Sequence, residues 1–297
     1  MKYSKSNFLM WTDINITIFS KINALNDIYD WLGIFYWLEK EFSRFLKDSD
    51  LSKLNDIKKL EVSNRFIDIL KHSQEIYNIS NKFFNPLVNL SNIWYSSDFK
   101  KWQFEKKNIE QNLDLDKISV LWNFIILKDN QNFDFGWIVK WYWVDLVSEF
   151  LKNKWYTDFI INAWWDIYLF WNNWKWEVPV VAIDSPFNEN DILATLDIKD
   201  KSISTSWIYK RKWNIEWKSF NHILNPEINK NNNEIISISL ISDKCYIADS
   251  FATACIAMWI EKSLIFLKKQ NINWIIIWSD WQIYKTNWIE NYNLCII

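Results

Sequence analysis

Two oxygen-bearing side chains, Asp249 and Thr253, stand four residues apart in the segment ADSFATA. Residues at that spacing share one face of a helix, so the carboxylate and the hydroxyl would point in the same direction. Both are hard oxygen ligands of the kind that Mg²⁺ prefers. Taken alone, the pattern is more typical of an aspartate that caps a helix while the threonine packs. The pair is therefore a candidate metal site that needs support from elsewhere in the chain.

His222 lies before a proline turn in the segment NHILNP and is one of two histidines. An imidazole titrates near neutral pH and can accept a proton from a reacting group. A lone loop histidine can also be an ordinary structural residue. We interpret His222 as a candidate base or orienting group, and His72, within a predicted surface helix, as structural.

The composition is unusual for a folded chain, because it has 23 tryptophans and only 2 glycines in 297 residues. An average chain of this length has about twenty glycines, roughly 7%, because turns need a residue that tolerates positive φ. Several tryptophans stand where turn glycines are expected, among them Trp164 and Trp165 in NAWWDI and Trp281 in IIIWSDWQIY. Our hypothesis is that the gene uses UGA for glycine and that many printed tryptophans are glycines.

The alternative is that the letters are literal and form an aromatic surface for sugars, bases or membrane interfaces. If the recoding hypothesis holds, a structure built on the literal letters should leave indoles exposed at Trp171, Trp278 and Trp281, whereas one continuous packed layer of these indoles would favour the literal alternative. Trp102 in KKWQFEK and Trp122 in VLWNF are the positions where we expect a genuine tryptophan.

The overall composition sets limits on the class of protein. Lys and Arg number 34 and Asp and Glu 36, a net charge of −2, which gives no electrostatic reason to expect nucleic acid or anionic membrane as the main partner. The cysteines Cys245, Cys255 and Cys295 lie in apolar surroundings and are expected to be buried free thiols. The first residues contain no continuous apolar stretch and no lipid-attachment cysteine, so a cytoplasmic location is expected for the chain as written.

Hydrophobic spacing indicates the elements that would position these residues. It predicts helices over residues 22–46 and 63–77, a helix starting near Val144, and a long helix over 249–269. It predicts strands over residues 13–19, 119–127, 158–163, 167–170, 178–183, 192–198, 202–206 and 234–242, with two more strands at the end of the chain. A charged stretch over 98–118 is typical of a solvated helix or helical hairpin. Many mostly antiparallel strands with few helices predict an α+β fold, and no linker divides the chain, so residues 1–297 are expected to form one domain.

Segments along nearly the whole chain, in the right order, resemble the ApbE family of FAD:protein FMN transferases once Trp is allowed to stand for Gly. The start MWT is similar to the family's M-G-T, FSRFLKDSDLSKLN to its S-x-Y-x-x-x-S-x-L-S-x-x-N stretch, and PLVNL to P-L-V-x-L. In the middle, FDFGWIVKWYWVD is similar to D-L-G-G-I-A-K-G-Y-A-V-D and INAWWDI to N-A-G-G-D. Later, STSWIYKR, NHILNP and ADSFATA are similar to T-S-G-x-Y-x-R, H-I-I-D-P and A-D-A-L-A-T-A.

The resemblance gives candidate roles to particular residues. It implies that a backbone carbonyl of the glycine-rich loop, at Trp137, completes a Mg²⁺ site with Asp249 and Thr253. Asp134 and Lys140 flank this loop and would otherwise be typical of a solvated turn; the resemblance implies that they contact the FAD cofactor. It implies further cofactor contacts from Met10, Phe45, Asn92, Ile93 and Leu224. Bare backbone N–H groups in such a loop can approach pyrophosphate oxygens, whereas indole side chains would fill that space.

The function that the resemblance implies is a Mg²⁺-dependent transferase. It would split FAD, attach FMN through a phosphoester to a Ser or Thr of a target protein with a flavinylation motif, such as a membrane redox-complex subunit, and release AMP. Family members are often exported and membrane-anchored. Two alternatives stay open, namely a Mg²⁺-dependent FAD pyrophosphatase that gives FMN and AMP, and a flavin-binding protein without turnover.

The chain departs from the family pattern at several positions. Phe45 stands where the family commonly has a tyrosine, which preserves stacking against a flavin but removes a hydroxyl. Asn225 replaces the usual aspartate of H-I-x-D-P, and Ala252 offers no side-chain ligand beside Thr253. The stretch before PLVNL is shortened to Asn85. These differences leave metal affinity and substrate preference open.

Overall fold

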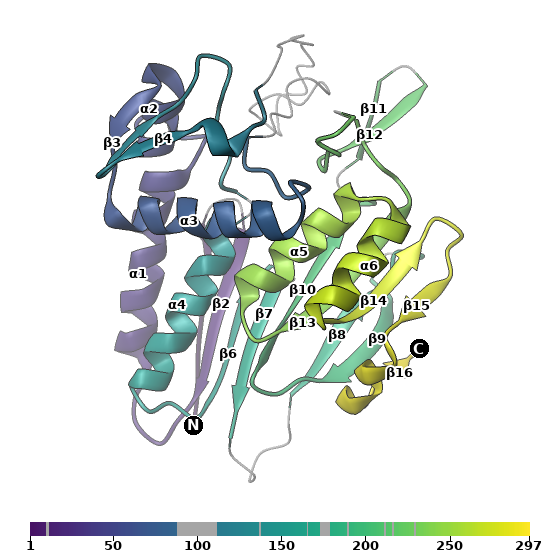
Figure 1. Ribbon diagram of the computed structural model, residues 1–297. Coiled ribbons are helices and arrows are strands. Elements are labelled where there is room, and N and C mark those ends of the chain that lie inside the picture. Colours follow the sequence, from purple (N-terminus) through teal and green to yellow (C-terminus); the bar gives the residue numbers. More distant parts are fainter. Residues whose placement is uncertain are drawn as a thin grey trace.

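A large antiparallel sheet forms the centre of the molecule (Figure 1). The computed structural model describes residues 1–9, 12–87, 112–136, 138–164, 166–172, 179–188, 190–210, 212–215, 217–228 and 230–297. In order across the large sheet the strands are β1 (Lys2–Leu9), β2 (Thr12–Phe19), β6 (Asp158–Ala163), β7 (Asp166–Trp171), β10 (Lys201–Trp207), β13 (Ile235–Ser242), β14 (Asn273–Trp278) and β15 (Ile283–Lys285). All neighbouring pairs in this sheet are antiparallel.

Three small antiparallel sheets lie around the large one. They are formed by β3 (Lys59–Glu61) with β5 (Phe124–Ile126) and β4 (Ser119–Leu121), by β11 (Lys212–Ile215) with β12 (Lys218–Asn221), and by β16 (Cys295–Ile296) with β9 (Ile192–Asp197) and β8 (Val180–Asp184). With the helices described next, they confirm the predicted α+β class with mostly antiparallel strands.

Helices cover one face of the large sheet. The α-helices are α1 (Leu25–Phe42), α2 (Asp50–Ile57), α3 (Asn64–Ile79), α4 (Val139–Asn153), α5 (Cys245–Ala257) and α6 (Ile260–Gln270), and short 3₁₀ turns span Leu115–Lys117 and Asn287–Tyr292. α4 packs on β6 and β7, and α5 packs on β10 and β13 beside it (Figure 1). α5 is buried on nearly all sides, which agrees with its apolar sequence. The candidate metal pair of the sequence therefore lies on a helix inside the core.

The sequence predicted the existence of most elements but not all of their ends. The strand predicted over 119–127 is instead the hairpin of β4 and β5, which turns at Trp122 and Asn123. The helix predicted near Val144 begins at Val139. The predicted N-terminal helix is shorter than 22–46, and the strand β1 was not predicted. The charged stretch 98–118 lies mostly outside the described residues.

The helix predicted over 249–269 is two helices, α5 and α6, separated at Met258 and Trp259. A distant loop stabilises this break. The side-chain amide of Asn232 donates to the carbonyl of Met258, and a carboxylate oxygen of Glu234 accepts a hydrogen bond from the N–H of Ile260 at 2.7 Å. These groups satisfy helix ends that would otherwise lack partners. The local pattern of residues contains no sign of them.

The backbone adds evidence on the identity of the tryptophans. Among the described residues, φ is positive at Trp122 (57°), Trp155 (64°), Trp164 (61°) and Trp281 (64°). This region suits glycine and is unfavourable for a bulky side chain. Trp122 and Trp155 are 95% and 90% exposed, so their indoles contribute no burial in return. The positive φ at Trp122 favours glycine and so counts against our expectation of a genuine tryptophan there, which stays a prediction.

The three indoles at Trp171, Trp278 and Trp281 differ in their exposure. Trp281 is exposed and Trp278 is half-buried. Trp171 is buried, with its ring edge-on to Phe19 at 5.1 Å between centroids, so the expectation of exposure was wrong there. These three indoles do not form one continuous layer. Trp102 lies outside the described residues.

The cysteines largely follow expectation. Cys245 and Cys255 are buried free thiols in α5. Cys295 is exposed, contrary to expectation, because it lies on β16 at the edge of a small sheet. None of the described helices has the length and apolarity to cross a bilayer.

Asp145 joins α4 to the start of α5. Its two carboxylate oxygens accept hydrogen bonds from the backbone N–H groups of Cys245 at 2.9 Å and of Tyr246 at 3.0 Å. No residue next to the start of α5 caps it by a side chain, so a carboxylate 100 residues earlier in the chain does so. Burial raises the pKa of Asp145 to about 6, although the two N–H donors oppose this shift.

Replacing Asp145 with Asn should change how stability depends on pH. Because the pKa is raised from 3.8 to about 6 on folding, the folded protein holds the proton more tightly than the unfolded chain. The free energy of unfolding should therefore fall as pH rises from about 4 to about 6, by up to about 3 kcal/mol at roughly 1.4 kcal/mol per pH unit. Asn lacks this slope and loses one N–H acceptor, about 1 kcal/mol. Urea unfolding from pH 4 to pH 7 measures both effects.

The exposed Asp243, replaced in the same way, serves as the control and should leave the pH profile unchanged. Parallel stability curves for Asp145→Asn and the original protein would show that burial does not raise this pKa.

Candidate functional site

A small pocket lies where the end of the large sheet meets α5. Its walls come from the start of α4, the turn between β6 and β7, the end of β10, the loop after β12, and α5. The lining residues are Gly136, Lys140, Trp141, Trp164, Asp166, Thr205, Ser206, Trp207, His222, Asp249 and Thr253. Among the residues proposed from the sequence, this acidic pocket brings together Lys140, His222, Asp249 and Thr253. Its cavity measures about 70 Å³.

Asp249 and Thr253 lie on α5, as the four-residue spacing predicted, and both side chains line the acidic pocket. Both residues are buried. The Thr253 hydroxyl lies 3.2 Å from the hydroxyl of Ser206 at the end of β10. The interpretation of Asp249 as a helix N-cap is wrong, because α5 begins four residues earlier and is capped by Asp145.

A second carboxyl group, Asp166, faces Asp249 across the pocket and was missed as a site residue. Asp166 is the first residue of β7 and is buried. Burial and the nearby charge of Asp249 both raise the pKa of Asp166, and its Oδ1 has no hydrogen-bond partner. Burial also raises the pKa of Asp249, while the charge of Lys140 opposes that shift. The only sequence signal was the aspartate that ends the motif NAWWD, which α5 meets only in the folded chain.

The donors of this pocket fit a Mg²⁺ ion. Two buried carboxyl groups that destabilise each other's charge, one with an oxygen that lacks a partner, would be neutralised by a divalent cation. Thr253 adds a hydroxyl oxygen. Within the described ranges no cluster of three His, Cys, Asp or Glu residues could hold a metal ion. Asp249, Thr253 and Asp166 would thus share the ion with backbone, water or substrate oxygens.

His222 reaches the acidic pocket from a loop that asparagines hold in place. The side chain of Asn231 donates to the carbonyl of Asn221 at 2.8 Å and to that of Ile223 at 2.7 Å, on both sides of His222. His222 is buried, and its ring centroid lies 5.7 Å from that of Trp207. Leu224 is buried two residues further on and does not line the pocket.

Asn225, the departure from the family aspartate, acts within the same loop. Its side-chain oxygen accepts a hydrogen bond from the N–H of Glu227 at 2.8 Å, and its own N–H donates to the carbonyl of Lys230 at 2.8 Å. An asparagine oxygen performs this turn role as an aspartate oxygen would. Its amide nitrogen is buried without a partner. The substitution thus preserves the loop geometry that positions His222.

Asp134 and Phe45 meet through Arg44, a residue that the sequence did not single out. Arg44 pairs with the Asp134 carboxylate, and its guanidinium lies over the ring of Phe45 at 4.9 Å. The other oxygen of Asp134 accepts the N–H of Gly136 at 2.9 Å, and Gly136 lines the acidic pocket. This cluster therefore lies next to the pocket. Ion pairing to a residue 90 positions away is not visible in local sequence.

Four proposed site residues, Met10, Asn92, Ile93 and Trp137, lie outside the described residues. The proposals for them therefore stay predictions. Ala252 is buried within α5, so its position could not present a ligand to the pocket without a rearrangement of the core.

Comparison with known proteins places this geometry in a family. The model of the ApbE family matches residues 10–276. The chain belongs to the ApbE family. Among curated ApbE relatives, the FAD:protein FMN transferase of Buchnera aphidicola subsp. Schizaphis graminum is 25% identical over 271 residues, which cover 85% of this chain and 78% of the relative. The FAD:protein FMN transferase of Vibrio cholerae is 21% identical over 250 residues, 80% of this chain and 75% of the relative.

Solved ApbE structures have the same fold. The ApbE protein from Thermotoga maritima superimposes with a TM-score of 0.87 at 17% identity, covering 98% of this chain and 99% of that chain. The flavin transferase ApbE from Vibrio cholerae gives a TM-score of 0.81 at 17% identity, with the same coverage. These likenesses concern the fold.

Indoles fill the pocket of this ApbE chain. Trp164 and Trp207 meet edge to face with centroids 6.0 Å apart, and Trp141 is buried beside them. The ammonium of Lys140 lies over the rings of Trp141 and Trp164, at 5.4 and 5.6 Å. The remaining 70 Å³ is far below the roughly 300–1,000 Å³ typical of ligand sites. The literal letters therefore leave no room for a dinucleotide next to the acids.

Proposed function

We propose that this ApbE-family chain is a Mg²⁺-dependent FAD:protein FMN transferase. The acceptor is a Ser or Thr hydroxyl of a partner protein. Its oxygen forms a bond to the phosphorus on the FMN side of the pyrophosphate, while the bond from that phosphorus to the bridging oxygen breaks. The bridging oxygen leaves with the bonding electrons as part of AMP. The hydroxyl proton passes to a base in the pocket and then to solvent.

The observation that carries the proposal is the pair of buried carboxyl groups, Asp166 and Asp249, beside Thr253 and Lys140 in one pocket. Burial raises the pKa of both acids and the charge of Asp249 raises that of Asp166 further, which suits a site that binds a cation. Pyrophosphate transfer needs such a site, since catalysis consists mainly of positioning and charge neutralisation. Membership of the family supports the same reaction.

Other residues of the chain would accept the proton and contact the phosphate and flavin groups. His222, whose flanking carbonyls accept hydrogen bonds from Asn231, lines the pocket and would accept the proton of the attacking hydroxyl. Lys140 also lines the pocket and would supply a positive charge to the phosphate oxygens. Arg44 and Phe45 would offer a cation and an aromatic face to the flavin side, and Asp134 connects Arg44 to Gly136. Bound Mg²⁺ would supply the charge that neutralises the phosphate oxygens as the reaction proceeds.

The proposal requires glycine at some of the printed tryptophans. Removing the indoles of Trp141, Trp164 and Trp207 would open the acidic pocket to a pyrophosphate. Trp164 has φ of 61°, where glycine is also the residue that the backbone favours. The gene sequence would test this reading directly, because UGA codons at these positions support it and UGG codons contradict it. Peptide masses of the native protein, lower by one Trp-to-Gly difference at each position, give the same answer.

The function is tested with protein made from a gene that encodes glycine at every position whose native codon proves to be UGA. The protein is incubated with FAD, MgCl₂ and a peptide that contains a flavinylation motif. We expect release of AMP together with a yellow peptide whose mass increases by FMN. AMP without labelled peptide would replace the proposal with a pyrophosphatase, and FAD binding without AMP would replace it with a flavin-binding protein.

A further inference from the structure

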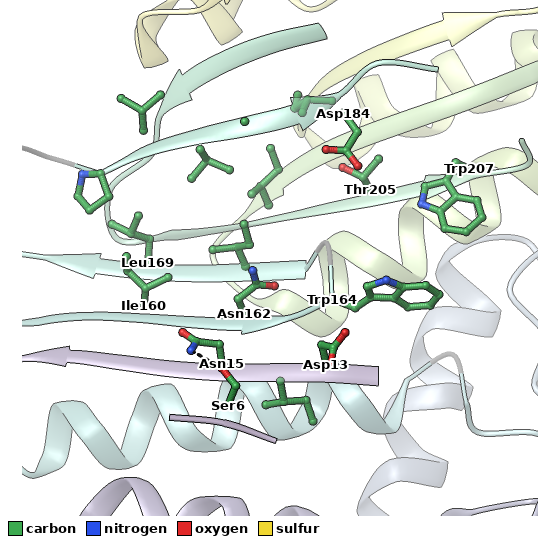
Figure 2. Close-up of a pocket in the computed structure, with 18 of the residues that line it drawn as sticks. Ser6, Asp13, Asn15, Ile160, Asn162, Trp164, Leu169, Asp184, Thr205 and Trp207 are labelled. Carbon is green, nitrogen blue, oxygen red and sulfur yellow. Dashed lines mark hydrogen bonds between the residues drawn. The ribbon is translucent and has the colours of Figure 1, made fainter. Parts of the chain in front are cut away.

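A groove of about 460 Å³ lies on the face of the large sheet opposite α4 and α5 (Figure 2). The pairing of the strands places Asn15, Asn162, Ile167 and Ile203 in one row across β2, β6, β7 and β10. All four line the groove. Directly paired residues share a face of the sheet, so the neighbouring row, which contains Asp166, points to the helices. The groove and the acidic pair are therefore on opposite sides of the same strands.

The other wall of the groove is the edge of β8. Six consecutive residues from Pro179 to Asp184 contact the cavity. Side chains alternate along a strand, so an unbroken run of contacts means that the backbone edge itself faces the groove. β8 is the last strand of its small sheet and pairs only with β9 among the described strands. Its other edge presents backbone N–H and C=O groups that can pair with an added strand.

The groove ends at the acidic pocket. Trp164, Thr205 and Trp207 line both cavities. Figure 2 shows these three residues and Asp184 gathered at one end of the groove, with Ile160 and Leu169 towards the other end. Glycine at Trp164 and Trp207 would join the two cavities into one. The side-chain oxygen of Asn162, in the floor of the groove, is buried without a hydrogen-bond partner.

We infer that this groove binds the acceptor segment of the partner protein as an extended strand added to the edge of β8. The inference rests on the proposed transferase function. At about 3.3 Å per residue, the five residues of β8 match roughly five residues of the segment, or about 16 Å. Backbone pairing with β8 supplies affinity, and the aliphatic floor favours small apolar side chains at alternate positions. The Ser or Thr that receives FMN lies at the end beside Thr205, where glycine at Trp164 and Trp207 would open the groove to the acids.

Two glutamate variants and a pair of peptides test the inference, with glycine encoded at the UGA positions. Ile160→Glu places a charge on the half-buried aliphatic floor, far from the acids. Ile192→Glu, on the exposed side of neighbouring β9, is the matched control. The probe is a fluorescent ten-residue peptide in which valine and alanine flank one threonine, with lysine at both ends. Its twin carries N-methyl groups at alternate backbone nitrogens, which prevents pairing with a strand edge.

We expect Ile160→Glu to raise the KM for the peptide at least tenfold, with kcat and the Kd for FAD unchanged, and Ile192→Glu to match the parent protein. The N-methylated twin should neither bind in fluorescence anisotropy nor accept FMN. Equal transfer to both peptides by the parent protein overturns the inference while the transferase function stands, and this result does not depend on the folding of any variant. Peptide binding that Ile160→Glu abolishes, without any release of AMP, supports the groove and overturns the transferase function instead.

Discussion

Asp249→Asn is expected to lower Mg²⁺-dependent release of AMP from FAD by roughly 10³-fold or more, and to make the metal-free protein more stable. The two effects have one cause. Burial and the neighbouring Asp166 make a negative charge at this place costly in the metal-free protein. Asparagine removes that cost but also removes a ligand that the cation needs. We expect the free energy of unfolding without metal to rise by about 1–3 kcal/mol at neutral pH.

The measurements are the rate of AMP release, the Mg²⁺ affinity by calorimetry, and urea unfolding with and without MgCl₂. In the parent protein Mg²⁺ should stabilise the fold, since it binds the folded state alone. In Asp249→Asn this stabilisation should be lost. Asp243→Asn, which removes an exposed carboxylate paired with Lys201, should change neither quantity. A variant that is destabilised without metal would show that Asp249 is a structural residue and would contradict the metal site.

Replacing Trp141, Trp164 and Trp207 with glycine is expected to create FAD binding in a protein made from the literal letters. The literal pocket of about 70 Å³ should bind FAD with no measurable affinity. Removing three indoles opens the space beside the acids and joins it to the groove. We expect a Kd in the micromolar range, at least about 10³-fold tighter, which corresponds to about 4 kcal/mol. Quenching of flavin fluorescence measures it.

A second glycine triple separates this effect from general relief of backbone strain. Trp122, Trp155 and Trp281 have positive φ and lie outside the acidic pocket. Glycine there should stabilise the protein by about 1 kcal/mol per site without creating FAD binding. If the literal protein already binds FAD as tightly as the pocket triple, the indoles do not block the site and the recoding hypothesis loses its main structural support.

The sequence predicted those site residues and strands that depend only on neighbouring residues. Asp249 and Thr253 were identified because helical spacing and a motif coincide, and α5 places them as predicted. Alternation of apolar residues predicted the strands of the second half. Asp166 and Arg44 were missed because each interacts with a residue far along the chain. Asp166 interacts electrostatically with Asp249, and Arg44 forms an ion pair with Asp134.

Some predicted element boundaries were wrong for the same reason, because residues distant in the sequence determine where the helices begin and end. The end of α5 depends on Asn232 and Glu234, and its beginning depends on Asp145, none of which is adjacent in sequence. The hairpin at Trp122 was predicted as one strand because tryptophan gives no turn signal, although the backbone there has the positive φ of a turn residue. Where tryptophan stands for glycine, local rules lose their strongest signal for turns.

The strand β10 separates two chemical surfaces by a single residue step. Ser204 and Ser206 turn towards α5, whereas Ile203 and Thr205 face the groove. Loss or gain of one residue in this strand would exchange the two sets of side chains and disrupt both surfaces together. A point substitution at a groove position, in contrast, leaves the register of the strand intact. If the groove binds the acceptor, the choice of acceptor could therefore change one side chain at a time while the face towards α5 stays the same.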